Sequence, residues 1–121
     1  MHKKYLIINT YSPTDGFNAE ESLEFILSIA SLEQPISILF LQNAAFQLLE
    51  QSQYELINRD LLAQTIQAFE LFALKNIYIE DSMLIKLKNL NLLINTNINI
   101  TKFSLNNFTD LYNKHDIILW Y

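Results

Sequence analysis

The stretch 36–49 constrains the fold more than any other, because a short apolar run passes there directly into a helical pattern. Residues 36–41 read Ile-Ser-Ile-Leu-Phe-Leu and are bounded by Pro35 on one side and by Gln42 and Asn43 on the other. A run of this kind suits a strand covered on both faces, and such strands belong to parallel sheets. Parallel strands need crossover connections, so the sequence predicts an α/β fold in which strands and helices alternate.

The rest of the chain follows that alternation. Apolar runs predict strands over residues 5–8, 36–41, 77–79 and 117–120, and one more within 90–103, either in part of 90–100 or over 100–103. Apolar residues at helical spacing predict helices that begin near residues 18, 62, 82 and 104. We expect a single domain over residues 1–121, a three-layer α/β sandwich around a mainly parallel five-stranded sheet. Four residues of the last helix are expected to face inward: Leu105, Phe108, Leu111 and Tyr112.

Polar residues mark the ends of the predicted helices. Asn18 and Ser104 are expected to cap the first and the last helix, and either Asp81 or Ser82 to cap the helix near residue 82. Asn89 follows that helix, and asparagine tolerates the left-handed conformation that closes many helices.

Composition and charge exclude several classes of function. The 121 residues contain no cysteine, so the chain has no disulfide, no thiolate metal ligand and no sulfur nucleophile. The formal charge is -5, with seven acids and two bases in residues 1–58 against six of each in 59–121. This balance argues against direct nucleic-acid binding, which needs clustered Lys and Arg. No run approaches the roughly 18 apolar residues of a membrane span, and we expect a cytoplasmic protein.

The loop from Thr10 to Gly16 is the most enzyme-like stretch. Its hydroxyl-rich sequence between a strand and a helix resembles a phosphate loop of flavodoxin type. However, Asp15 would bring a negative charge near the phosphate oxygens, and Pro13 removes one amide donor. Ser and Thr are also ordinary turn residues. We therefore favour a plain loop or partner contact, and keep phosphate or flavin binding as the alternative.

Other polar residues give weaker indications of chemistry. His115 and Asp116 are adjacent, as in part of a catalytic triad, but no nucleophile elbow accompanies them because Gly16 is the only glycine. Glu80 and Asp81 follow a predicted strand, a pattern more typical of a helix N-terminus than of a site. Two distant histidines without cysteine do not make a metal site. No catalytic residue, cofactor or metal is therefore expected.

The helix after residue 41 predicts an interface. It covers about seven residues, yet its apolar side chains lie on more than one side. We expect Phe46, Leu48 and Leu49 to lie largely at a subunit interface, where aromatic anchors are favoured. The alternative is that all three fit into the core of the domain itself.

Several landmarks together resemble one family over nearly the whole length. The most specific is Asn-Ala-Ala-Phe-Gln-Leu-Leu at 43–49, followed by Asn-Arg-Asp at 58–60 and Asp-Ile-Ile-Leu at 116–119. Lys3 and Lys4, Pro13, and Glu-Ser-Leu-Glu at 21–24 add to them. In order and spacing the chain resembles the TusC/DsrF-like subunits of sulfur-relay complexes, in the DsrE/DsrF/DsrH superfamily, whose domains have a flavodoxin-like α/β sandwich.

The resemblance implies a role in a heterohexamer that passes persulfide sulfur toward 2-thiouridine at the tRNA wobble position. Its partners are two sister subunits, TusB-like and TusD-like, with two copies of each of the three chains. One sister carries a reactive cysteine at the end of the third strand, where this chain has Ile79, Glu80 and Asp81. Because a persulfide relay requires a thiolate, the resemblance implies a noncatalytic structural subunit.

Two other functions stay open. A small flavodoxin-like protein would bind phosphate or flavin through the loop from Thr10 to Gly16, and flavin absorbance would reveal it. A stand-alone α/β scaffold would be a stable monomer.

Overall fold

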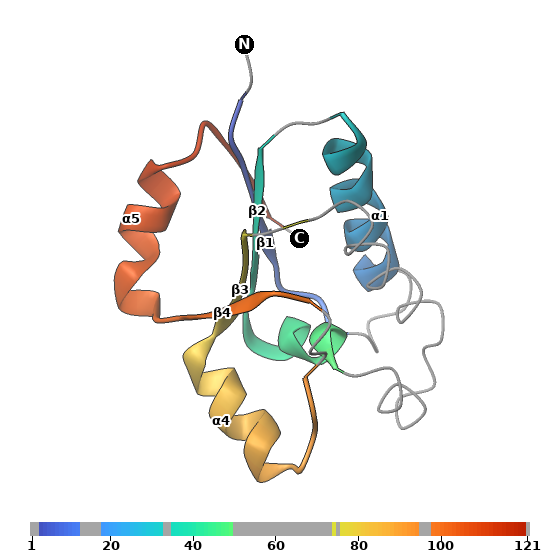
Figure 1. The fold of residues 1–121 in the computed structure, drawn as a ribbon, viewed down its shortest axis with the longest axis vertical. Coiled ribbons are helices and arrows are strands. Elements are labelled where there is room, and N and C mark those ends of the chain that lie inside the picture. Colours follow the sequence, from blue (N-terminus) through green and yellow to red (C-terminus); the bar gives the residue numbers. More distant parts are fainter. Residues whose placement is uncertain are drawn as a thin grey trace.

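The computed structural model describes residues 3–12, 18–32, 35–49, 74, 76–94 and 98–120. Within these ranges, strands alternate with helical segments (Figure 1). The strands are β1 (Tyr5–Asn9), β2 (Ile36–Phe40), β3 (Asn76–Glu80), β4 (Ile100–Phe103) and β5 (Ile117–Trp120). The helices are α1 (Asn18–Ser31), α4 (Asp81–Asn89) and α5 (Phe108–Asn113), with 3-10 segments η1 (Gln42–Leu48) and η2 (Leu105–Asn107). The helix expected to begin near residue 62 lies outside the described residues.

The five strands form one sheet in the order β4-β3-β2-β1-β5, and every pair in it is parallel. The predicted α/β sandwich and its parallel sheet are therefore confirmed. All five residues of β2 are buried, as expected for a strand covered on both faces. The fourth strand covers residues 100–103, the later of the two ranges that the sequence left open.

The strand order decides which face each connection covers. β1, β2, β3 and β4 are neighbours in sequence order, so right-handed crossovers place the connections between them on one face. The connection from β4 to β5 crosses the sheet in the opposite direction and therefore lies on the other face. In Figure 1, α5 accordingly stands on the opposite side of the sheet from α1 and η1.

Each face of the sheet has its own apolar core, because side chains of a strand alternate between the faces. Ile7 belongs to the larger core, whereas Leu6 and Ile8 belong to the smaller. Residues of α1, η1 and α4 fill the larger core, and Leu111 of α5 contributes to the smaller. Among the described helices, none has the length and apolar character that a membrane-spanning segment requires.

The ends of α4 differ from the prediction. Glu80 is the N-cap and Asp81 is already helical, so neither Asp81 nor Ser82 is the cap. The residue with the left-handed backbone is Asn91, with φ of 58°, not Asn89. The helix ends in a Schellman motif, in which Asn91 N–H donates to Lys88 C=O and Leu92 N–H to Leu87 C=O.

The last helix begins differently from the prediction. The Ser104 hydroxyl accepts a hydrogen bond from Asn106 N–H, as a cap does, but the turn that it caps is the 3-10 segment η2. The helix α5 follows from Phe108. Of the four residues expected inward, Leu111 is buried and Phe108 partly buried, whereas Leu105 and Tyr112 are exposed.

Candidate functional site

The carboxyl ends of β3 and β4 are the natural place to look for a site. The helices that follow these neighbouring strands lie on opposite faces of the sheet. Met83 and Leu87 of α4, which follows β3, pack in the larger core, whereas Leu111 of α5, which follows β4, packs in the smaller. Open α/β sheets bind ligands at such a switch point. Glu80 ends β3 there, opposite Phe103 of β4.

Glu80 is engaged in a structural contact at this point. Its side chain is buried, and its Oε2 atom accepts a hydrogen bond of 2.8 Å from the backbone N–H of Gln42. Gln42 has a positive φ of 51°, which turns the chain from β2 into η1. The contact therefore fixes the sharp turn after β2 against the end of β3. Asp81 is held locally, since its Oδ1 accepts from the backbone N–H of Ser82 at 2.8 Å.

A second polar cluster lies behind the ends of β1 and β2. Asn9, Ser22 and Gln47 are all fully buried, and they come from β1, α1 and η1. Asn9 Nδ2 donates to the Ser22 hydroxyl at 2.8 Å, and Gln47 Nε2 donates to Asn9 Oδ1 at 3.1 Å and to the carbonyl of Tyr11. These bonds join the three segments that surround the start of the first loop.

This cluster forms hydrogen bonds with the start of the loop from Thr10 to Gly16. The backbone N–H of Tyr11 donates to Asn9 Oδ1 at 3.2 Å, so this amide already has a partner within the chain. Residues 13–17 lie outside the described residues. The described part of the loop, residues 10–12, thus contributes to a structural network through Tyr11.

His115 and Asp116 form hydrogen bonds with different parts of the chain. Asp116 Oδ2 accepts from the backbone N–H of Lys4 at 2.8 Å. The His115 ring lies between two other groups: Nδ1 is 2.7 Å from the carbonyl oxygen of Leu111, and Nε2 is 2.8 Å from the Ser37 hydroxyl. The ring is partly buried and joins the end of α5 to β2. The adjacent pair in the sequence does not form the His-Asp pair of a triad.

The three residues expected at an interface lie in different environments. Leu48 and Leu49 are fully buried in the larger core of the chain itself. Phe46 is partly buried, and the Lys86 ammonium lies 5.9 Å from the centre of its ring. Because buried side chains offer no surface to a partner, only Phe46 of the three retains a side chain that a partner could cover.

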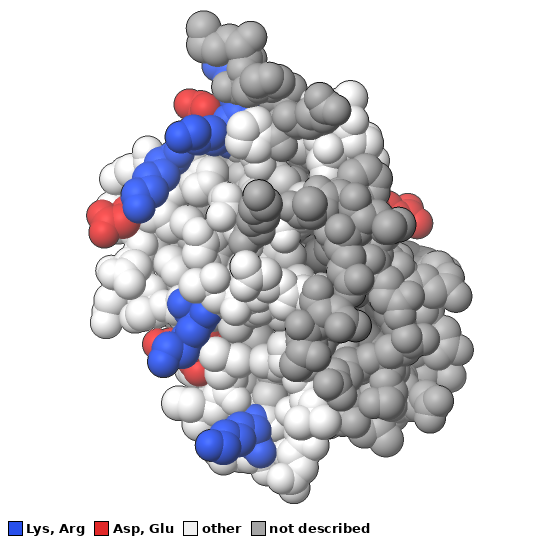
Figure 2. Space-filling model, in the orientation of Figure 1, with Lys and Arg blue, Asp and Glu red and all other residues white. Residues whose placement is uncertain are grey.

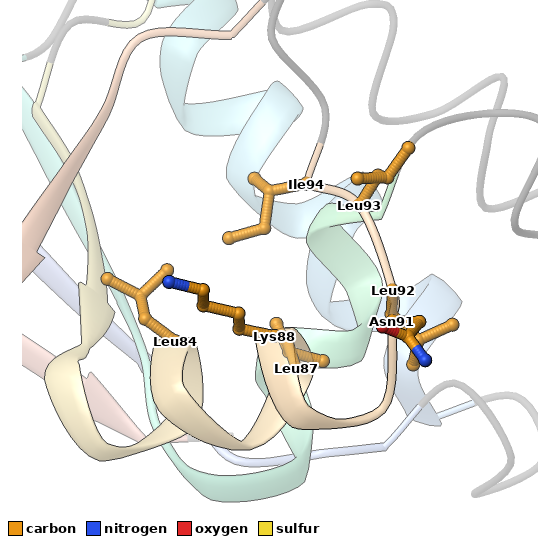
Figure 3. Close-up of a pocket in the computed structure, with 7 residues that line it drawn as sticks. All are labelled: Leu84, Leu87, Lys88, Asn91, Leu92, Leu93 and Ile94. Atoms are coloured by element: carbon orange, nitrogen blue, oxygen red, sulfur yellow. The ribbon is translucent and has the colours of Figure 1, made fainter.

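An apolar hollow of about 470 Å³ lies beside α4. Figure 3 shows its lining residues, with Leu84 and Lys88 on α4 and Ile94 on the segment that returns past the helix. Leu93 is 56% exposed beside it. The described residues place only one charged side chain, Lys88, in this hollow, so it is a surface for apolar contact more than for chemistry.

The charged side chains of the described residues do not form one continuous patch on the face drawn in Figure 2. On the face drawn in Figure 2, lysines form separate clusters with uncharged surface between them. Among the described residues, no group of three histidine, aspartate or glutamate side chains could hold a metal ion. The described residues therefore show structural polar contacts at the switch point, without a nucleophile paired with a base there.

Sequence reasoning missed two of these contacts. The Glu80 carboxylate and the amide of Gln42 are 38 positions apart, and so are Asn9 and Gln47. One signal was available, since Asn9 is a polar residue at the end of an otherwise apolar strand. Buried polar groups need partners, so such a residue predicts a network although not its members.

Comparisons with known proteins agree with this fold. The sequence profile of the family described as DsrE/DsrF-like family matches residues 3–120. A protein of Pseudomonas aeruginosa named Protein TusC homolog is 35% identical over 80 residues, which cover 65% of this chain and 66% of the relative, slightly under two thirds of its length. The crystal structure of the ychN protein from E. coli matches with a TM-score of 0.77 at 11% identity, over 98% of this chain and 99% of that chain. At that identity, the likeness shows a shared fold.

Proposed function

The chain belongs to the DsrE/DsrF-like family, and from this premise we propose that it is a noncatalytic structural subunit of a sulfur-relay complex. The complex is cytoplasmic and passes persulfide sulfur toward 2-thiouridine at the wobble position of tRNA. Its other members are a TusB-like and a TusD-like subunit, with two copies of each chain in a heterohexamer. The name of the Pseudomonas relative, Protein TusC homolog, supports this assignment.

The observation that carries the noncatalytic role is the absence of cysteine from the 121 residues. Sulfur in a persulfide is held and passed on by a thiolate, and no other side chain replaces it. The family resemblance places a sister subunit's reactive cysteine at the end of the third strand. Here this neighbourhood is Ile79, Glu80 and Asp81. The Glu80 carboxylate accepts a hydrogen bond from the backbone N–H of Gln42, in the turn after β2. This contact supports a structural role, in which Glu80 stabilises the carboxyl edge of the sheet between β2 and β3.

Isolation of the tagged chain from its own cells tests the complex. We expect two further proteins in amounts equal to the chain, each identified by mass, and a native mass of six subunits. The proposal would be wrong if the chain were recovered alone as a monomer, because a structural subunit needs its partners.

Radiolabelled sulfur tests the noncatalytic role. When the assembled complex receives sulfur from a labelled persulfide donor, the label should remain on a partner subunit after denaturing separation without reductant. The matched control is the same separation after reductant, which should release the label as sulfide. Stable label on this chain itself would contradict the noncatalytic role.

A further inference from the structure

The two faces of the sheet are covered unequally. Of the described helices, α5 covers the face of the smaller core, and it has only six residues. Beside α5, the amino ends of β2 and β3 form the floor of a hollow of about 240 Å³. It is lined by nine residues: Lys4, Pro35, Ile36, Ser37, Asn76, Tyr78, Leu111, Lys114 and His115.

Polar residues are the larger part of the described lining of this hollow. Of the nine described residues that line it, six are polar and none is an aspartate or glutamate. Among these lining residues, Lys4 and Lys114 carry ammonium groups, Asn76 carries an amide and Tyr78 a phenol. In a chain with a formal charge of -5, this lining offers positive charge and donors to a negative ligand.

The wall of the hollow is held in place before any ligand binds. A carbonyl oxygen only accepts, so His115 Nδ1 carries the hydrogen that goes to Leu111. In the neutral ring, Nε2 then accepts from the Ser37 hydroxyl. Ser37 is 5% exposed, on the floor of the hollow. This pair fixes the end of α5 against β2, and with it the position of Lys114.

The described carboxylate nearest in sequence, that of Asp116, does not line the hollow. Asp116 accepts from the backbone N–H of Lys4 and is not among the lining residues. Figure 2 shows lysine side chains gathered over the end of α5 and the start of β1, with acidic atoms at the margins of the cluster. None of the described side chains that line the hollow would therefore cancel the Coulomb attraction to a bound anion.

We propose that this hollow binds a small phosphate-bearing molecule. Lysine ammonium groups bind phosphate as point charges, and neutral donors such as Asn76 and Tyr78 add direction. The volume lies below the 300–1,000 Å³ typical of drug-sized ligands, so the ligand is an ion or a short ester. The site lies at the opposite end of the strands from Glu80, away from the edge considered above.

Titration of ¹⁵N-labelled protein with inorganic phosphate and with glycerol 3-phosphate tests the site. At low ionic strength, we expect saturable shifts of the amide signals of Ser37, Asn76 and Lys114 with either phosphate. Stronger binding of the ester would indicate an ester ligand, and equal binding the free ion. Glycerol, the neutral part of the ester, should cause no shifts at these positions.

Matched lysine variants decide whether the binding is specific. Lys114→Ala should weaken phosphate binding about fivefold, the upper range for an exposed charge pair. Lys88→Ala removes an exposed lysine of α4, outside this hollow, and should leave the affinity unchanged. Tyr78→Phe should weaken binding while the ring keeps its contact with Phe103. Equal effects of the two lysine variants, or shifts spread over all lysine-rich surfaces, would overturn the proposal.

Discussion

Buried polar side chains in this protein work in pairs that join distant segments. Among the described residues, five are buried beside the cores: Asn9, Ser22, Ser37, Gln47 and Glu80. Each has a hydrogen-bond partner, and most of the bonds span 13 positions or more. The net gain of such a bond is small, but loss of one partner leaves the other desolvated and unpaired. These residues therefore fix which segments meet more than they raise the overall stability.

At this scale, the contact of His115 gives a direct prediction. His115→Ala removes the acceptor of a buried hydroxyl and the donor to Leu111 C=O. We expect the free energy of unfolding to fall by about 1–3 kcal/mol. Urea denaturation followed by circular dichroism measures this change.

Ser37→Ala provides the control. If the two side chains bond to each other, the double variant should lose less stability than the sum of the single variants, by about 0.5–1.5 kcal/mol. Strictly additive losses would show that the Ser37–His115 bond contributes nothing to the folded state.

At the scale of elements, scarcity of glycine shapes the turns. Gly16 is the only glycine, so the two described positive-φ positions use Gln42 and Asn91. Asparagine tolerates the left-handed region better than most residues, whereas glutamine does so at a cost. The hydrogen bonds of the Schellman motif offset this cost at Asn91. At Gln42, the hydrogen bond from its backbone N–H to the Glu80 carboxylate offsets it.

Substitution at Gln42 tests this account. Gln42→Val places a β-branched residue in the left-handed region and should lower the free energy of unfolding by about 1–2 kcal/mol. Gln42→Gly should be neutral or slightly stabilising. Asn43→Val changes the exposed neighbour, whose φ is negative, and should cost less than Gln42→Val. Equal losses at both positions in urea denaturation would contradict strain at residue 42.

The sequence predicted the strands better than the ends of the helices. Continuous apolar runs identify buried strands because few other structures use them. In contrast, the inward assignment of Leu105 and Tyr112 is wrong, since both are exposed. The 3-10 turn η2 has three residues per turn, so it shifts the phase of the stripe before α5 begins. A cap residue such as Ser104 does not reveal which kind of helix it caps.

At the scale of the molecule, the sequence predicted a parallel sheet but not its order. An apolar run indicates that a strand is buried, but not which strand it pairs with. The sequences of β1 and β5 therefore did not predict that these two strands are neighbours. The candidate site was also predicted only in part. The sequence indicated Glu80 as an acidic residue after a strand, but its contact with Gln42 follows from the strand order, which the sequence did not predict. Contacts across the sheet become visible only once the strands are placed.

Assembly is the prediction that belongs to the whole molecule. We expect Phe46 to contact a partner subunit, because it is partly exposed beside Lys86. Phe46→Glu should prevent assembly, since it places a carboxylate in an apolar contact. Size-exclusion chromatography of the co-expressed subunits measures assembly, and circular dichroism checks that the chain is folded.

Leu32→Glu is the control for this variant. Leu32 is 68% exposed at the end of α1, and the same new charge there should leave assembly intact. Normal assembly of a folded Phe46→Glu chain would place the interface elsewhere. Unfolding of that variant would instead assign Phe46 to the core of the chain.

The position of β5 beside β1 also sets the order in which the sheet can be completed. The other three pairs join strands that follow one another along the chain, whereas Tyr5 of β1 pairs with Ile117 of β5. Contacts between residues so far apart along the chain form slowly, so we expect β5 to join the sheet last during folding. Until then, β1 exposes an unpaired edge on which the β5 of a second molecule can pair. We therefore expect the pairing of β5 to determine whether the sheet is completed within one chain or this strand is exchanged between two chains, as in domain swapping.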